Sequence, residues 1–223
     1  MTPGGLTRVQ RRVAKLVLAT AGRAGFRLAG GAALVASHLT QRPTRDIDAF
    51  PAEDVDVSSV GDEVIEALRN AGYDVAPTRR SSAFVSMTVT AGRSRRSRFE
   101  VDLGRDHIAW PTTTTSLGPT LSPRELAANK VLALFGRVQT RDLADLHALA
   151  ERFDLESMLA DAAAKDEGFD RAVLAEMTRL VVARPEPEWP VGADVAELKS
   201  FGRWLAGALE RDEPLARPAD GSG

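Results

Sequence analysis

The sequence predicts an α+β protein in which an α/β first half is followed by an all-helical second half. In the first half, short runs with an apolar residue at every second position alternate with segments whose apolar residues recur at every third or fourth position. After the turn-rich run WPTTTTSLGPT at 110–120, only the helical spacing continues. These observations predict a domain at 1–120, a helical domain at 121–215 and a disordered tail at 216–223.

The first half contains two kinds of segment. A helix with its basic residues opposite its apolar ones is expected over 6–22, and the glycine pair of FRLAGG joins a short strand to a second helix. Two further strands flank the basic turn AGRSRR. The expected strands are 26–29, 45–50, 84–92 and 98–105, and the expected helices after the first are 32–39 and 60–71.

The second half begins with a clear helix start. Ser122 and Glu125 have the spacing of a capping box, Pro123 occupies the first helical position, and the pattern closes at Gly136. Further helices are expected at 141–153, 155–166, 169–183 and 194–210.

Composition and residue types limit the function. With 223 residues, 43% of them hydrophobic, the chain has the make-up of an ordinary globular protein. It has neither an apolar run near the roughly 20 residues that a membrane span needs nor a signal-peptide pattern, so we expect a cytoplasmic protein without membrane contact. There are no cysteines, and His38, His107 and His147 are far apart, so any metal should be held by oxygen.

Charge is unevenly distributed along the chain. Residues 1–45 carry eight basic side chains and no acidic one, whereas residues 142–223 carry nine basic and eighteen acidic. This favours a polyanion near the N-terminus, although the solvated face of a helix would explain the same charges.

Asp46 and Asp48 in RDIDAF are candidate metal ligands. Spacing alone is weak support, because Asp54 and Asp56 have it too. On a strand, however, Asp46 and Asp48 point to one face while Ile47 points to the other. Adjacent carboxylates repel unless a cation lies between them, and Mg²⁺ suits carboxylates and phosphates together.

Asp102 and the glycine pair extend this candidate site. In RFEVDLGR, Asp102 lies on the polar face and would reach the same metal if the strand paired beside RDIDAF; a solvated sheet face is the alternative. Gly30 and Gly31 open a helix directly after a strand, where backbone N–H groups favour an anion and a side chain would obstruct it. Such turns are also common without a ligand.

Four segments in order resemble a known family. LAGGAAL, RPTRDIDAF, FEVDL and LSPRELAANKVLALFGRVQTRDLADLHAL resemble the nucleotidyltransferase toxins of the AbiEii group, including the mycobacterial MenT proteins. The resemblance runs from about residue 26 to residue 150. It implies a polymerase-β-like nucleotidyltransferase core with a mixed sheet, followed by the helical region.

The resemblance also implies residue roles. Asp46 and Asp48 would hold Mg²⁺, with Mn²⁺ as the alternative ion, and Gly30 and Gly31 would approach the nucleotide phosphates. Lys130 and Asp142 would complete the active site. Lys130 has support of its own, because it lies in the apolar run LAANKVLALF and must either extend outward or meet an anion. For Asp142 the alternative is an acid favoured by the helix dipole.

The chain departs from the common pattern at one position. Many nucleotidyltransferases have Ser or Thr after the glycine pair, but this chain has Ala32, so no hydroxyl can contact phosphate from there. Thr44 is a candidate replacement from the next strand. Arg137 and Arg141 are weaker candidates for phosphate or RNA contacts, and His38 is expected on a helix face rather than as a base.

The implied reaction is transfer of a nucleoside monophosphate from an NTP to an RNA acceptor, foremost the 3′ end of tRNA, by a toxin that an antitoxin restrains. Asp102 would be a third metal ligand or the general base. Two alternatives remain open: transfer to a small molecule such as an aminoglycoside, and a non-catalytic antitoxin or degenerate binding protein. The expected RNA contacts are Arg8, Arg11, Arg12, Lys15, Arg95 and Arg96.

Overall fold

The computed structural model describes residues 5–51, 55–92, 98–211, 213 and 215. The chain divides into two compact units, Met1–Leu126 and Ala127–Gly223. Arg95, Arg96, Asp54 and the expected tail lie outside the described residues. Among those that are described, no helix is both long enough and apolar enough to cross a membrane.

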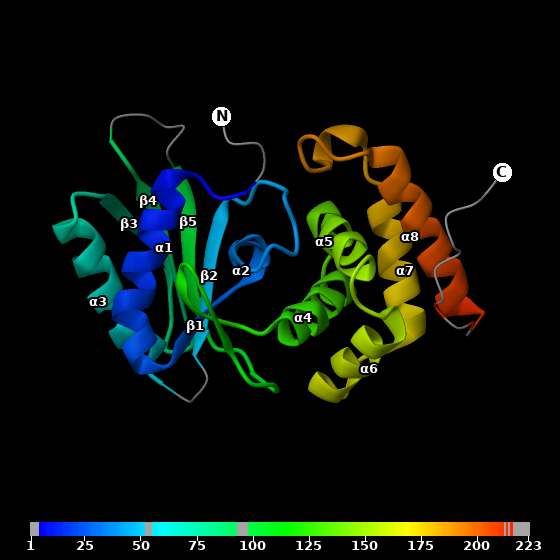
Figure 1. Cartoon of the computed structure of the whole chain (residues 1–223), viewed down its shortest axis with the longest axis horizontal. Helices are drawn as coiled ribbons and strands as arrows, with labels where there is room; N and C mark the ends of the chain where they lie inside the picture. Colours follow the sequence, from blue (N-terminus) through cyan, green and yellow to red (C-terminus); the bar gives the residue numbers. More distant parts are fainter. Residues whose placement is uncertain (1–4, 52–54, 93–97, 212, 214, 216–223) are drawn as a thin grey trace. The chain divides into compact units, whose positions relative to one another are not determined.

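A seven-stranded mixed sheet forms the centre of the first unit (Figure 1). The strand order is β3-β4-β5-β2-β1-β7-β6. The pairs β2–β5 and β1–β7 are parallel and the others antiparallel, so the predicted mixed sheet is confirmed. The strands are β1 (Phe26–Ala29), β2 (Asp46–Pro51), β3 (Asp74–Arg80), β4 (Phe84–Thr90), β5 (Arg98–Gly104), β6 (Thr113–Thr115) and β7 (Gly118–Thr120).

Three of these strands were not predicted, for a physical reason. β3 buries only Val75, so its sequence shows no alternation of apolar and polar residues. Its pairing register with β4 also shifts after Pro77. β6 and β7 are three residues each and lie in a stretch that has the composition of a turn. All three lie at or next to an edge of the sheet, where little apolar surface is needed.

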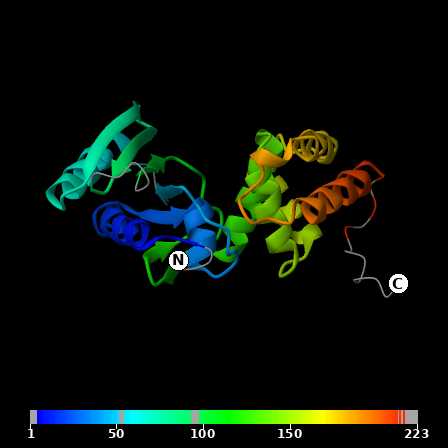
Figure 2. The ribbon, with the colours of Figure 1, turned by 90° about the horizontal axis from the view of Figure 1, so that it is seen from above.

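Helices α1 (Arg8–Ala21) and α3 (Val57–Asn70) lie beside each other and pack against the sheet (Figure 1). Figure 2 shows α3 beside β3 at one end of the sheet. A capping box between Thr7 and Gln10 starts α1, and Asp56 caps α3 by accepting a hydrogen bond from the Ser58 N–H. Asp54 and Asp56 have the same spacing as Asp46 and Asp48, and Asp56 therefore has a structural role as a helix cap.

Helix α2 (Gly30–Ala36) follows β1 directly and ends in a left-handed residue. His38 has φ 58°, and the N–H groups of His38 and Leu39 bond back to the carbonyls of Val35 and Leu34. This is the hydrogen-bond pattern of a Schellman motif. The expectation that His38 occupies a helix face was wrong, because the helix ends before it.

The second unit is helical throughout its described part. Its elements are α4 (Pro123–Gly136, which begins in the first unit), α5 (Thr140–Ala150), α6 (Leu155–Lys165), α7 (Arg171–Val182), the 3₁₀ turn η3 (Glu186–Glu188) and α8 (Val195–Glu210). Gly202 lets α8 approach its neighbours closely, since a Cβ there would lie 2.5 Å from Val182 Cγ2 and 2.9 Å from Leu143 Cδ2. α8 therefore packs tightly on α5 and α7.

Candidate active site

Asp48 and Asp102 are direct neighbours across the parallel pair of β2 and β5. The flanking Ile47 and Val101 are fully buried, so the two carboxylates share the opposite face of the sheet. Asp46 lies on this face too, two register positions away, opposite Glu100. The sheet thus gathers acidic side chains from two strands that are about fifty residues apart in sequence.

The aspartates are aligned but do not all converge. Among the residues that the structure describes, the one set of three acidic or histidine ligand atoms within 4.8 Å of one another belongs to His147, Glu151 and Glu197 in the second unit. Residues two apart on a strand, such as Asp46 and Asp48, have Cα atoms about 7 Å apart. Asp48 and Asp102 are the members of the predicted set that are direct register partners.

Asp102 has a polar atom that the described residues leave unsatisfied. Its Oδ1 is buried and has no hydrogen-bond partner. A buried carboxylate oxygen without a donor costs several kcal/mol unless a cation or another donor reaches it. Beside the Asp48 carboxylate, this oxygen suits a hard divalent cation, so the residues present fit the Mg²⁺ that the sequence predicts.

Gly30 lies against the Asp48 carboxylate, and Gly31 lies against the side chains of Thr44 and Arg42. Gly30 has φ +59°, and a Cβ built on it would stand 1.8 Å from Asp48 Oδ2. A Cβ on Gly31 would stand 2.8 Å from Thr44 Oγ1 and 3.3 Å from Arg42 Nη2. Both positions require glycine because backbone approaches side chains of the candidate site at close range.

Gln10 was not predicted from the sequence and supports the same loop. Its side chain is buried, and its Nε2 donates a hydrogen bond of 2.8 Å to the Thr44 carbonyl. The Thr44 hydroxyl in turn donates to the Asp46 carbonyl at 3.3 Å. The sequence feature that could have indicated Gln10 is its position on the apolar face of α1, three and four residues before the buried Val13 and Ala14.

Lys130 is the centre of a charged cluster in the second unit. Its side chain is only 8% exposed, and its Nζ lies 3.0 Å from Asp142 Oδ1 and 2.9 Å from Asp145 Oδ2. Both aspartates are fully buried. Lys130 therefore does not extend outward to solvent, and the anions that it meets within this unit are two carboxylates of α5.

Arg137 completes this cluster. Its Nε donates to Asp142 Oδ2 at 2.8 Å and its Nη2 to Asp142 Oδ1 at 3.1 Å, the bidentate geometry of an arginine–carboxylate pair. Burial by itself would raise the pKa of Asp142, but Lys130 and Arg137 together lower it. Asp145 was not among the predicted site residues, although the Arg-Asp-x-x-Asp spacing puts Asp142 and Asp145 on one helix face.

A family model described as the nucleotidyl transferase AbiEii toxin of type IV toxin–antitoxin systems matches residues 16–201. The match includes β2, β5 and the Lys130 cluster. The chain belongs to the AbiEii nucleotidyltransferase toxin family. The predicted family is thereby confirmed, and this AbiEii protein is a nucleotidyltransferase. Comparison with curated protein sequences finds no match.

Solved structures agree with this assignment at the level of the fold. MenT4, the nucleotidyltransferase toxin Rv2826c of Mycobacterium tuberculosis H37Rv, is similar with a TM-score of 0.61 and 19% identity, over 90% of this chain and 82% of that one. JHP933 of Helicobacter pylori is similar with a TM-score of 0.58 and 15% identity, over 90% of each chain. The AbiEii protein therefore has the predicted polymerase-β-like nucleotidyltransferase fold.

Proposed function

We propose that this AbiEii protein is a metal-dependent toxin that transfers a nucleoside monophosphate from an NTP to the 3′ end of a tRNA and releases pyrophosphate. The observation that carries the proposal is the pairing of Asp48 with Asp102 beside Gly30, where a buried carboxylate oxygen lacks a donor. A carboxylate pair next to a glycine backbone suits a cation bound together with phosphates.

Asp46, Asp48 and Asp102 are the residues that would hold Mg²⁺, or Mn²⁺ in its place. When bound, the ion would offset the negative charge of the phosphates and ease ionisation of the attacking hydroxyl. Asp102 either completes the ligand set or accepts the proton of the acceptor hydroxyl as general base. These two roles are distinguished below by the Mg²⁺ dependence of an Asp102 variant.

Gly30, Gly31 and Thr44 would accommodate the triphosphate. The missing side chains at 30 and 31 leave backbone close to Asp48 and Thr44, where phosphate oxygens can approach. The Thr44 hydroxyl is the nearest one to Gly31 and stands in for the hydroxyl that Ala32 lacks. Gln10 would hold the Thr44 backbone in place.

Lys130 is assigned the contact with the triphosphate. A lysine ammonium is a compact charge suited to phosphate, and Asp142 and Asp145 would keep it in one orientation. Asp142 is in this way a positioning residue that acts through Lys130. Arg137, half-exposed beside Asp142, offers a second cation to the same ligand.

The exposed basic residues of α1 would bind the RNA. Arg8, Arg11, Arg12 and Lys15 are all exposed, and no acidic residue accompanies them on this helix. Such a surface attracts a phosphate backbone without reading its sequence. Arg95 and Arg96, which lie outside the described residues, are proposed as further RNA contacts. An antitoxin partner follows from the type IV toxin–antitoxin family and would restrain the activity in the cell.

The deciding experiment is transfer of label from each α-labelled NTP to total tRNA in the presence of Mg²⁺. We expect label from one preferred NTP, and at least about a 100-fold loss in Asp48→Asn, because a ligand to the cation is removed. Asp56→Asn is the matched control, since asparagine caps a helix as well as aspartate does. Folded protein that labels an aminoglycoside and not tRNA, or that turns over no NTP, would refute the proposal.

A further inference from the structure

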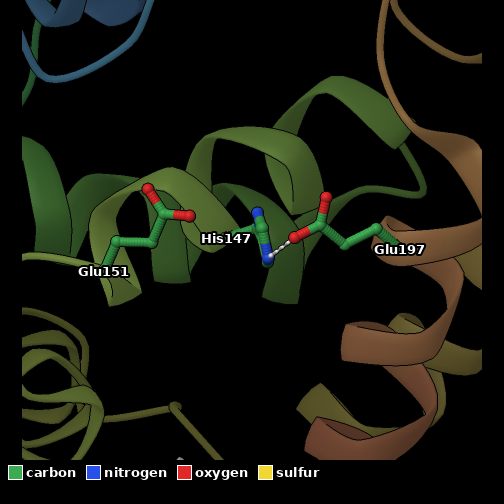
Figure 3. Close-up of side chains that lie close together, drawn as sticks. All are labelled: His147, Glu151 and Glu197. Carbon is green, nitrogen blue, oxygen red and sulfur yellow. Dashed lines mark ion pairs between the residues drawn. The ribbon is translucent and has the colours of Figure 1, made fainter. Parts of the chain in front are cut away.

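The helical unit contains a second constellation of ligand atoms, which the proposed reaction does not use. His147 and Glu151 come from α5 and Glu197 from the first turn of α8 (Figure 3). One ligand atom from each lies within 4.8 Å of the other two. His147 and Glu151 are four residues apart, so they project from the same face of α5 one helical turn apart.

The imidazole is held in place before any ion binds. The His147 side chain is only 10% exposed, and its ring packs edge-on against Phe201 at a centroid distance of 4.9 Å. Its Nε2 points at Glu197 Oε1, 3.5 Å away (Figure 3). A buried ring with one nitrogen aimed at the cluster loses little freedom on binding, which favours a metal ligand.

The carboxylates of Glu151 and Glu197 supply negative charge and can change their side-chain rotamers. Glu151 and Glu197 are exposed, so their side chains can rotate without disturbing the core. Glu151 also stands where α5 ends, and an acid there is unfavourable because the C-terminus of a helix carries partial negative charge. A bound cation would remove both this repulsion and that between the carboxylates.

We propose that His147, Glu151 and Glu197 form a binding site for a divalent transition metal ion of the Zn²⁺ class, linking α5 to α8. One imidazole with two carboxylates is a donor set that suits Zn²⁺, whereas Mg²⁺ and Ca²⁺ prefer oxygen alone. Ligand atoms around tetrahedral Zn²⁺ are about 3.4 Å apart, so modest rotations of the two glutamates close the present set. Water would fill the fourth position.

The site would connect metal binding with the Lys130 cluster through one helix. Asp142, Asp145 and His147 lie on the same eleven-residue helix, α5, and Glu197 anchors it to α8. Occupation would stabilise the packing of α5 on α8 and so the unit that holds Lys130. The sequence predicts only oxygen ligands, because the three histidines are far apart in the chain. A glutamate that reaches His147 from another helix cannot be recognised from local spacing.

The test is calorimetric titration of the full chain with Zn²⁺ in excess Mg²⁺, repeated in an Asp48→Asn background so that the sheet carboxylates do not contribute. We expect one Zn²⁺ per chain in both backgrounds, and an affinity at least about tenfold lower in Glu151→Gln and Glu197→Gln. Because His147→Gln alters a buried side chain, the two exposed glutamates are the decisive variants. Glu176→Gln, an exposed glutamate on α7, is the matched control.

A second readout is independent of activity. Zn²⁺ should raise the melting temperature of the wild-type chain and of Glu176→Gln equally, and should raise that of Glu197→Gln by less. Equal Zn²⁺ affinity in wild type, Glu151→Gln and Glu197→Gln would overturn the proposal, as would no binding above the Mg²⁺ background. The His147–Glu197 contact would then be an ion pair only.

Discussion

Gly30 lies so close to the Asp48 carboxylate that a Cβ on residue 30 would stand 1.8 Å from Asp48 Oδ2. Gly30 also has a left-handed backbone, with φ +59°. The turn after β1 and the carboxylate of β2 are therefore one structural unit, and a change in either must displace the other.

Gly30→Ala should abolish nucleotidyl transfer, because the new methyl group must push Asp48 away from Asp102. Gly72→Ala is the matched control, since Gly72 has φ +86° but no heavy atom within 4 Å of its Cβ position. It incurs only the left-handed strain of about 1–2 kcal/mol. Thermal unfolding and labelling assays of both variants check this. Comparable activity of the two would show that the close contact has no functional role.

Asp102→Asn separates the two roles proposed for Asp102. If Asp102 is a metal ligand, the variant should need at least about tenfold more Mg²⁺ for half-maximal rate. If it is the general base, kcat should fall about 10²–10⁴-fold with an unchanged Mg²⁺ requirement. Glu100→Gln, two residues earlier on the same strand, is the control. A variant with wild-type kcat and wild-type Mg²⁺ dependence would remove Asp102 from the active site.

Asp142→Asn should destabilise the protein by about 3 kcal/mol at neutral pH, because it leaves Lys130 and Arg137 with less negative charge in a buried site. The pKa of Asp142 is lowered in the folded protein from its ordinary value of 3.8. The stabilisation that Asp142 provides is therefore fully present above that value and is lost as pH falls through the lowered folded pKa.

Denaturant unfolding of wild type and Asp142→Asn as a function of pH measures this effect. The difference in unfolding free energy should be constant between about pH 6 and pH 8 and should shrink below the ordinary carboxyl pKa near 3.8. Asp166→Asn, on an exposed residue that follows α6, provides the baseline. A difference that grew on acidification would mean that the carboxylate does not interact favourably with Lys130 and Arg137.

Gln10→Met should raise the KM for the NTP with a smaller effect on kcat. Methionine fills the same space but leaves the Thr44 carbonyl without its buried donor, at a cost of about 1–3 kcal/mol. The loop that carries Thr44 and leads to Asp46 should then be less well ordered. Gln41→Met, on an exposed residue of the same loop, is the control. Unchanged kinetics in Gln10→Met would show that α1 does not support the site.

Arg11→Ala combined with Arg12→Ala should weaken tRNA binding and flatten its salt dependence. The slope of log K against log salt should fall by about 1 for each RNA phosphate that the variant no longer neutralises. A double variant of Arg152 and Arg203, two exposed arginines of the second unit, removes the same charge elsewhere. Binding assays over a salt series compare the two. The same slope in both double variants would exclude α1 from the RNA interface.

Local physical chemistry made much of the fold predictable from sequence. The apolar spacing of α1, α4 and α5 and the N-caps of α1 and α4 depend on neighbouring residues, and these helices lie where the sequence predicts them. The alternation in β2 is local as well, so the shared face of Asp46 and Asp48 could be predicted. The short edge strands could not be, because little burial constrains their sequences.

The helices, the alternating central strands and the family can all be inferred from the chain alone, since each depends on residues that are near one another or on motifs in order. The tertiary structure, in contrast, determines which charged groups contact one another. The parallel pairing sets Asp48 beside Asp102, the helical unit buries Lys130 between Asp142 and Asp145, and α8 brings Glu197 to His147. Such pairings join residues from different elements, and strand register and helix packing set their distances rather than any local spacing.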